Sequence, residues 1–203
     1  MTEPGVLMRL ITGSAIIVLL LAGASAYAAV TRTVNETNGL QGWRFLEGDI
    51  EIELVQRLPD QTRALLMNHE FSRKVIEQLA LSCMFQTIIR NTDASGSSRT
   101  VAIDLTRWRT HHAGVARELL MKEPLLAAWD EQDASEAARL VIRWGMFPTR
   151  QEYLPSDYNW GLTAFGIPPG SKFDLDVSWT EDGKPFSGVI RDVVCAPDVD
   201  KLK

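Results

Sequence analysis

A strict alternation near the C-terminus constrains the fold more than any other feature of the sequence. In the segment FDLDVSW, residues 173–179, every odd position is large and apolar and every even position is polar. Such a pattern places one face of a strand on a core and the other in water. The turn EDGK at 181–184 follows, and FSGVIRDVVC then returns. Together they predict an antiparallel pair, in which Val189, Val193 and Cys195 share the buried face.

Similar strands are predicted earlier in the chain. Residues 50–54 alternate between apolar positions and Glu51 and Glu53, which are expected to face solvent. The segments FQTIIRNT and TVAIDLTRW are separated by DASGSS, residues 93–98, whose composition is typical of a turn. These two segments therefore predict a hairpin. Another strand is expected within SDYNWGLTAFG, before a Pro-Pro-Gly turn.

Helices are predicted over 60–82 and within 115–146. The first region carries an apolar stripe at three- and four-residue steps, formed by Ala64, Met67, Phe71, Val75 and Leu79. A break is expected at Ser72, a good N-cap, and Cys83 lies one step further along the stripe. In the second region Pro124 suits a first helical turn, and Asp133 with Glu136 resembles a capping box. The segment VARELLMKE, at its start, fits a strand or a helix.

Strands joined by turns, with grouped helices, favour an antiparallel sheet packing over a βαβ fold. We expect a mostly β protein with α insertions: an antiparallel β-sandwich, immunoglobulin-like only in the loose sense. The expected domains are a signal peptide or membrane-anchor helix at 1–30, a linker or edge segment at 31–42, and one extracytoplasmic β-rich domain at 43–203.

The N-terminus resembles an export signal. A single basic residue, Arg9, precedes an uncharged run over 10–30 that contains the small-x-small sites 24–26 and 26–28. The run is also long enough to span a bilayer of about 30 Å, so a retained anchor is the alternative to a cleaved signal. Its short, strongly apolar centre, 15–22, favours cleavage. Either way, the rest of the chain is expected in the periplasm or on the outer face of the inner membrane.

Two cysteines, Cys83 and Cys195, are present. In an exported chain an even cysteine count favours a disulfide, and both residues are predicted to face the core. A bridge between them closes a loop of about 100 residues, for which the chain-entropy model gives about 4.7 kcal/mol of stabilisation.

A copper site is the alternative interpretation of Cys83. The soft or borderline ligands that suit copper are Cys83, Met84, Met67, His69, His111 and His112. The chain nevertheless has no Cys-x-x-Cys, His-x-His or Met-rich run. Neighbours on a strand also point to opposite faces, so Cys83 and Met84 are poorly placed to chelate one ion. A catalytic cysteine needs a histidine base, and the local sequence marks none.

Six tryptophans raise the question of a binding surface. Four lie in or beside patterned elements, where core packing is the default: Trp108, Trp144, Trp160 and Trp179. The segment DYNWG, 157–161, has the least regular pattern. Tyr158 and Trp160, with Phe165 and Ile167 beyond them, are therefore candidate partner-binding residues. The alternative is a loop that Trp160 packs onto the sandwich.

Composition narrows the class of function. The net charge is −5 and no basic run exists, so the positive surface required for nucleic-acid binding is missing. No phosphate-binding, hydrolase or haem-attachment motif is present. We expect a non-enzymatic extracytoplasmic accessory or protein-interaction domain without a cofactor, whose partner is a protein such as a membrane complex. If the N-terminus is retained, residues 10–30 contact the membrane. A copper-binding or copper-delivery protein is the alternative.

The N-terminal prediction is tested by mass and fractionation. A cleaved signal predicts a mature chain that starts near Tyr27 or Ala29 and is soluble after cell fractionation. The full-length mass in a membrane pellet that high salt does not strip would instead show a retained anchor, because salt releases only charge-held proteins.

Overall fold

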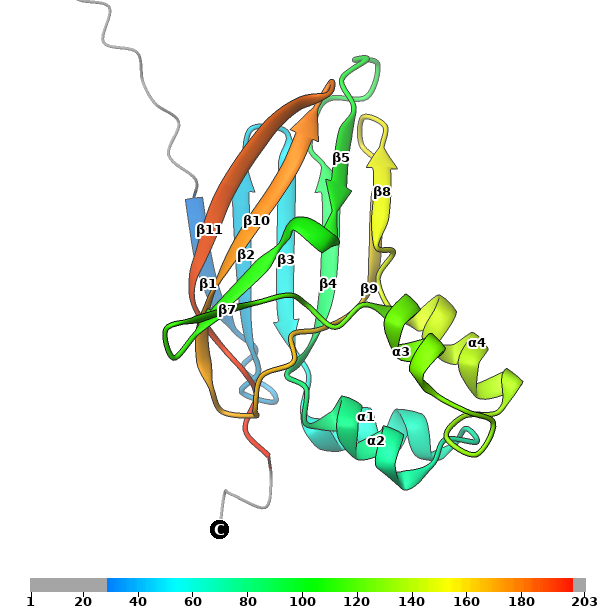
Figure 1. Ribbon diagram of the computed structural model, residues 1–203. Helices are drawn as coiled ribbons and strands as arrows, with labels where there is room; N and C mark the ends of the chain where they lie inside the picture. Colours follow the sequence, from blue (N-terminus) through cyan, green and yellow to red (C-terminus); the bar gives the residue numbers. More distant parts are fainter. Residues whose placement is uncertain (1–28, 199–203) are drawn as a thin grey trace, which may run out of the picture.

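In the part of the chain that the structure describes, two antiparallel sheets pack face to face, and four short helices gather near one end of them (Figure 1). The computed structural model describes residues 29–198. The first sheet has the order β1-β2-β3-β4-β9. Its strands are β1 (Ala29–Val34), β2 (Gln41–Glu47), β3 (Ile50–Gln56), β4 (Met84–Asn91) and β9 (Tyr158–Ala164). The predicted β-sandwich with helical insertions is confirmed.

The second sheet is organised around one long strand. Its strands are β5 (Val101–Asp104), β6 (Arg109–His112), β7 (Val115–Arg117), β8 (Arg150–Tyr153), β10 (Lys172–Glu181) and β11 (Lys184–Val194). Strand β10 pairs with β11 on one side, and on the other with β6 near its start and β5 near its end. Strands β7 and β8 extend the sheet from β6 and β5. The short 3-10 helix η1 (Leu105–Arg107) follows β5.

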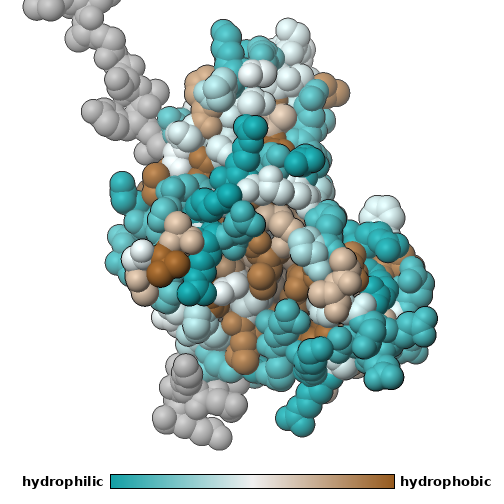
Figure 2. Space-filling model, in the orientation of Figure 1, coloured by the Kyte–Doolittle hydropathy of each residue, from teal (hydrophilic) through white to brown (hydrophobic). Residues whose placement is uncertain are grey.

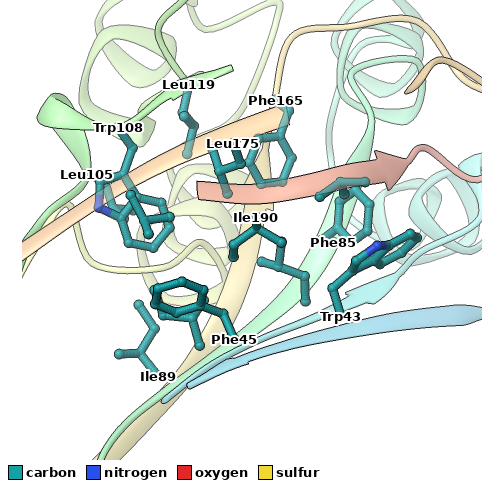
Figure 3. Packing of buried hydrophobic residues seen from close by; sticks show 14 of the residues in the cluster. Trp43, Phe45, Phe85, Ile89, Leu105, Trp108, Leu119, Phe165, Leu175 and Ile190 are labelled. Carbon is teal, nitrogen blue, oxygen red and sulfur yellow. The ribbon is translucent and has the colours of Figure 1, made fainter. Parts of the chain in front are cut away.

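The main core lies between the sheets, and the alternation in β10 supplies one of its walls. The odd positions of β10 from Phe173 to Trp179 are all buried. They face aromatic residues of the first sheet, including Phe85, whose ring centre lies 5.4 Å from that of Phe165. The ring of Phe165 also contacts that of Phe173, at 5.1 Å. Figure 3 shows Phe85 and Phe165 among the packed residues of this core. Such aromatic contacts, edge-on between Phe85 and Phe165 and tilted between Phe165 and Phe173, add to the stabilisation from buried apolar area.

The predicted hairpin across 93–98 is wrong. Strand β4 belongs to the first sheet and β5 to the second, so the segment 92–100 crosses between sheets. Both edges of β4 are occupied, by β3 and β9, and leave no edge for β5. Turn residues mark a reversal of the chain but do not specify which strands then pair.

Residues 29–34 form an edge strand. Strand β1 pairs with β2 along its whole length, so the segment 31–42 begins as an edge strand rather than as a linker. The predicted signal or anchor lies outside the described residues, apart from its last two positions, which begin β1. Within residues 29–198 no helix combines the length and apolar character needed to cross a bilayer.

The helices confirm the break at Ser72 and correct several details. They are α1 (Pro59–Met67), α2 (Arg73–Ala80), α3 (Lys122–Ala128) and α4 (Glu136–Gly145). The Ser72 hydroxyl accepts a hydrogen bond from the Val75 amide and so caps α2. In α1, Thr62 and Leu66 are buried, whereas Ala64 and Met67 are exposed. The break resets the helical phase, so a stripe read continuously across it is misplaced.

The second helical region starts later than predicted. Its first residues, 115–117, form β7, and its second helix is capped by Ser135, which accepts from the Ala138 amide. Asp133 is instead paired with Lys74, at 3.0 Å, and accepts a hydrogen bond from Ser72. This residue therefore joins the two helical regions rather than capping a helix.

The predicted exposure of Glu51 and the predicted burial of Val189 are both wrong. Glu51 is buried on the outer face of the first sheet, where it pairs with Arg44 and, at 3.6 Å, with Arg90. Val189 turns away from the core because β11 bulges at Asp192, which has a φ of 59°. The extra residue changes the parity of the strand, so Ile190 is the buried residue there.

The predicted disulfide between Cys83 and Cys195 is confirmed, with a Cα–Cα distance of 5.3 Å. Cys83 lies between α2 and β4, and Cys195 directly follows β11. The bridge therefore links the helical end of the first sheet to the last strand of the second. A buried disulfide is consistent with an oxidising extracytoplasmic compartment.

Loss of this bridge is expected to destabilise the domain. We predict that Cys195→Ser lowers the free energy of unfolding by about 2–5 kcal/mol, measured by urea denaturation. Cys83→Ser and the double variant should lose a similar amount, because each removes the same bond. Two single losses that add up in the double variant would contradict this prediction.

Candidate functional site

An apolar pocket lies where the helices meet the outer face of the first sheet. Its volume is about 250 Å³. Its walls come from α1 and the residues just before it, and from α2, α4, β4 and β9. The lining residues are Arg57, Thr62, Leu65, Leu66, Leu79, Met84, Gln86, Val141, Ile142, Gly145, Met146, Trp160 and Leu162. Ten of these thirteen residues are apolar or glycine, so the pocket suits an apolar group.

The helices that form the walls have their own small core. This second cluster includes Leu66, Val75, Leu79, Met84, Leu125, Trp129, Ile142, Met146 and Ala164. The helical insertion is also hydrogen-bonded to the edge of β9, since the Phe147 amide donates to Leu162 at 2.8 Å and the Leu120 amide donates to Ala164 at 2.9 Å. The pocket is therefore held on packed, hydrogen-bonded elements.

Strand β9 places two of the predicted partner-binding residues on the outer face beside the pocket. Tyr158 is 64% exposed and Trp160 is 61% exposed. Trp160 lies opposite Ile88 of β4, and Tyr158 lies opposite Arg90. The Arg90 guanidinium is 5.6 Å from the Tyr158 ring centre, a cation–π distance. Trp160 lines the pocket, so the exposed aromatic surface and the pocket are continuous.

The other two predicted partner-binding residues are not at the surface. Phe165 and Ile167 are buried in the main core. The chain leaves the outer face after β9, and the amide of Phe165 is hydrogen-bonded to the Ser82 carbonyl at 3.0 Å. The alternative in which Trp160 packs a loop onto the sandwich is also wrong, because Trp160 belongs to a strand and faces outward.

Further exposed apolar side chains lie on the helices that form the pocket walls. On α4, Leu140 is 42% exposed and Trp144 is 81% exposed, next to the lining residues Val141 and Gly145. The core role expected for Trp144 is therefore wrong. On α1, Met67 is exposed and directly follows the lining residue Leu66. Leu140 and Trp144 are four residues apart, a spacing that places both side chains on one face of α4. This spacing is visible in the sequence but was not among the predicted apolar stripes.

Polar groups occur on one part of the pocket wall. They belong to Arg57, Thr62 and Gln86. The terminal guanidinium nitrogen Nη2 of Arg57 donates to the Gln61 carbonyl at 3.2 Å. Burial lowers the pKa of Arg57 from its ordinary value. An arginine remains protonated in proteins, so this side of the pocket carries positive charge.

The proposed copper ligands lie on separate elements. Cys83 is bonded to Cys195, so in this state its thiolate is not free to bind a metal. Met84 is buried in the helical core, and Met67 and His69 are exposed at the end of α1. Within residues 29–198 no cluster of three or more His, Cys, Asp or Glu residues is arranged to hold a metal ion.

The two remaining histidines lie in the other sheet. His111 contacts Asp176 at 2.6 Å, and His112 contacts the Lys172 carbonyl at 3.0 Å. Both are on β6, which pairs with β10 in the second sheet. A turn follows them, in which Ala113 and Gly114 have positive φ.

On the face shown in Figure 2, hydrophobic residues gather near the middle and are bordered by hydrophilic ones. A second hollow in the molecule is lined in part by Leu81, Leu120, Ile167, Pro168 and Pro169. It is wider than the first pocket, and its walls are more polar, including Gln78, Arg117 and Asp198. The enclosed apolar pocket is therefore the stronger candidate site.

The difference in burial between Trp160 and Phe165 predicts a difference in stability between their alanine variants. Trp160→Ala should change the free energy of unfolding by about 1 kcal/mol or less, because most of the side chain is exposed. Phe165→Ala should cost about 3–5 kcal/mol, because it leaves a cavity in the main core. Urea denaturation of both variants tests this, and similar losses would show that Trp160 is structural.

No protein-family model, curated protein or solved structure matches the chain. The features that point to a function are therefore the pocket and the exposed aromatic residues beside it.

Proposed function

We propose that the protein is a non-enzymatic, extracytoplasmic accessory domain that binds a partner protein through the apolar pocket. One observation carries the proposal: an apolar cavity of about 250 Å³ is continuous with a strand that exposes Tyr158 and Trp160. Protein interfaces are enriched in tyrosine and tryptophan, and their centres are poor in charge. Exposed apolar patches on soluble domains commonly mark such interfaces.

The chemistry of the walls supports binding rather than catalysis at this site. The lining includes no Asp, Glu, His, Cys or Lys. Its polar residues are Arg57, Thr62 and Gln86, and none of these is a general base near neutral pH. The apolar side chains exclude water and complement another apolar surface, which is the property that an interface needs.

The bridge and the N-terminal pattern support the proposed location. Disulfides persist in oxidising compartments, and Cys83–Cys195 is buried. The apolar run at 10–30 is the pattern of an export signal or an anchor. Both support a domain in the periplasm or on the outer face of the inner membrane, either secreted or tethered by its N-terminus. The partner is a protein that shares this compartment.

Photo-crosslinking tests the proposed interface in cells that make the full chain. Benzoylphenylalanine in place of Trp160 should give a discrete adduct with one partner. Gly145→Leu should abolish it, because a side chain there enters the pocket. A Cβ at Gly145 has no atom within 4 Å, so the fold should tolerate the change.

Two controls make the result specific. Benzoylphenylalanine in place of Phe186, which is 40% exposed on the second sheet, should give no such adduct. Ala137→Leu, exposed on the same helix as Gly145 but outside the pocket, should leave the adduct unchanged. An adduct that survives Gly145→Leu, or that forms equally at Phe186, would count against the proposed interface.

A further inference from the structure

Two hydrogen-bond donors on the pocket wall lack partners. Among the described residues, the Thr62 hydroxyl and the Arg57 Nε are both buried without a hydrogen bond. Thr62 is 1% exposed and lines the pocket. A threonine in a helix can donate its hydroxyl to the carbonyl four residues earlier, but the Thr62 hydroxyl makes no such bond. Buried donors without acceptors are rare and destabilising.

The positive charge beside them is also uncompensated. Within residues 29–198, no carboxylate lies within ion-pair distance of Arg57. Arg63, on the same helical segment, differs sharply, because it pairs with Asp60, Glu77 and Asp198. In a chain with a net charge of −5, a half-buried arginine without an acidic partner is a site that an external anion complements.

The size of the pocket limits what accompanies the anion. An apolar cavity of about 150 Å³ binds benzene. The pocket, at about 250 Å³, therefore accepts one large apolar side chain together with a small polar group. The ligand must present both groups within the space of a single residue.

We propose that the pocket binds the C-terminal residue of the partner protein, with its apolar side chain in the cavity and its terminal carboxylate on Arg57 and Thr62. In a C-terminal residue both groups leave the same Cα, as the pocket requires, whereas an internal acidic residue is separate from the one that fills the cavity. Capture of C-terminal carboxylates is a known mode of peptide recognition. This inference rests on the proposed function and names the part of the partner that is bound.

The surface around the pocket favours a polypeptide over an acyl chain. Tyr158 and Trp144 are exposed beyond the lining, on two different elements. A short acyl chain held within the cavity does not cover them. A peptide that continues outward from its C-terminal residue contacts this surface and covers apolar area.

Fluorescence anisotropy with the full chain tests the inference. The probes are fluorescein-labelled heptapeptides with six degenerate positions and a final Leu, Ile, Phe or Trp, each made as the free acid and as the C-terminal amide. At least one free acid should bind saturably, and its amide should bind at least about tenfold more weakly, because it cannot form the charged pair with Arg57. Gly145→Leu should abolish both.

Variants of Arg57 and Thr62 test whether these two donors cause the difference in affinity between the free acid and the amide. Arg57→Gln should remove the difference between acid and amide, and Thr62→Val should reduce it severalfold. Arg73→Gln, a change at an exposed arginine of α2, should have no effect. Thermal unfolding by circular dichroism checks that each variant is folded, so that lost binding is not lost structure.

The outcomes separate this inference from the proposed function. Equal binding of acid and amide, with loss in Gly145→Leu, would retain the apolar interface and overturn the role of the carboxylate. Sodium decanoate is tested alongside the peptides. Arg57-dependent binding of decanoate without any peptide binding would overturn both proposals in favour of an acyl ligand. Binding of no probe would count against both.

Discussion

The Cys83–Cys195 bridge is the constraint on which the rest of the structure depends. It covalently joins the end of α2 and the start of β4 to the segment after β11, and so links both sheets to the helices. Cys83 adopts a φ of 55°, a conformation that is unfavourable for a side-chain-bearing residue and persists only where the surroundings enforce it. Met84, the next residue, lines the pocket, so the pocket wall is anchored directly beside the bridge.

The first sheet serves two cores at once, and the candidate site lies at their boundary. Its inner face packs against the second sheet, while one end of its outer face packs against the helices. The helical cover stops at Leu162, and beyond it Trp160 and Tyr158 are exposed. The pocket thus exists because the helices cover only part of the sheet. A continuous helical layer would have buried these aromatic residues as core.

Local patterns predicted β3, β4, β5, β10 and β11 and the break at Ser72, because each depends on the spacing of neighbouring residues. The bridge was predicted differently, from an even cysteine count in a chain with an export-like N-terminus. Features that depend on distant partners were not predictable. The separation of β4 from β5 depends on β9 occupying the edge of β4, and the orientation of Val189 depends on a one-residue bulge. Tyr158 and Trp160 were identified from an irregular segment. The donors on Arg57 and Thr62 gave no sequence signal, because the lack of a partner appears only in three dimensions.

The central place of β10 has a consequence for the order in which the molecule can assemble. All five strands of the first sheet precede β10 in the chain, so this sheet can pair before synthesis ends. The second sheet cannot, because β5 and β6 are joined through β10, which begins at Lys172. Cys83 likewise waits for Cys195 before it can be oxidised correctly. Until β10 and Cys195 have been added, a growing chain therefore exposes the inner face of the first sheet and the free thiol of Cys83, and incomplete chains with such exposed core surface are prone to aggregation.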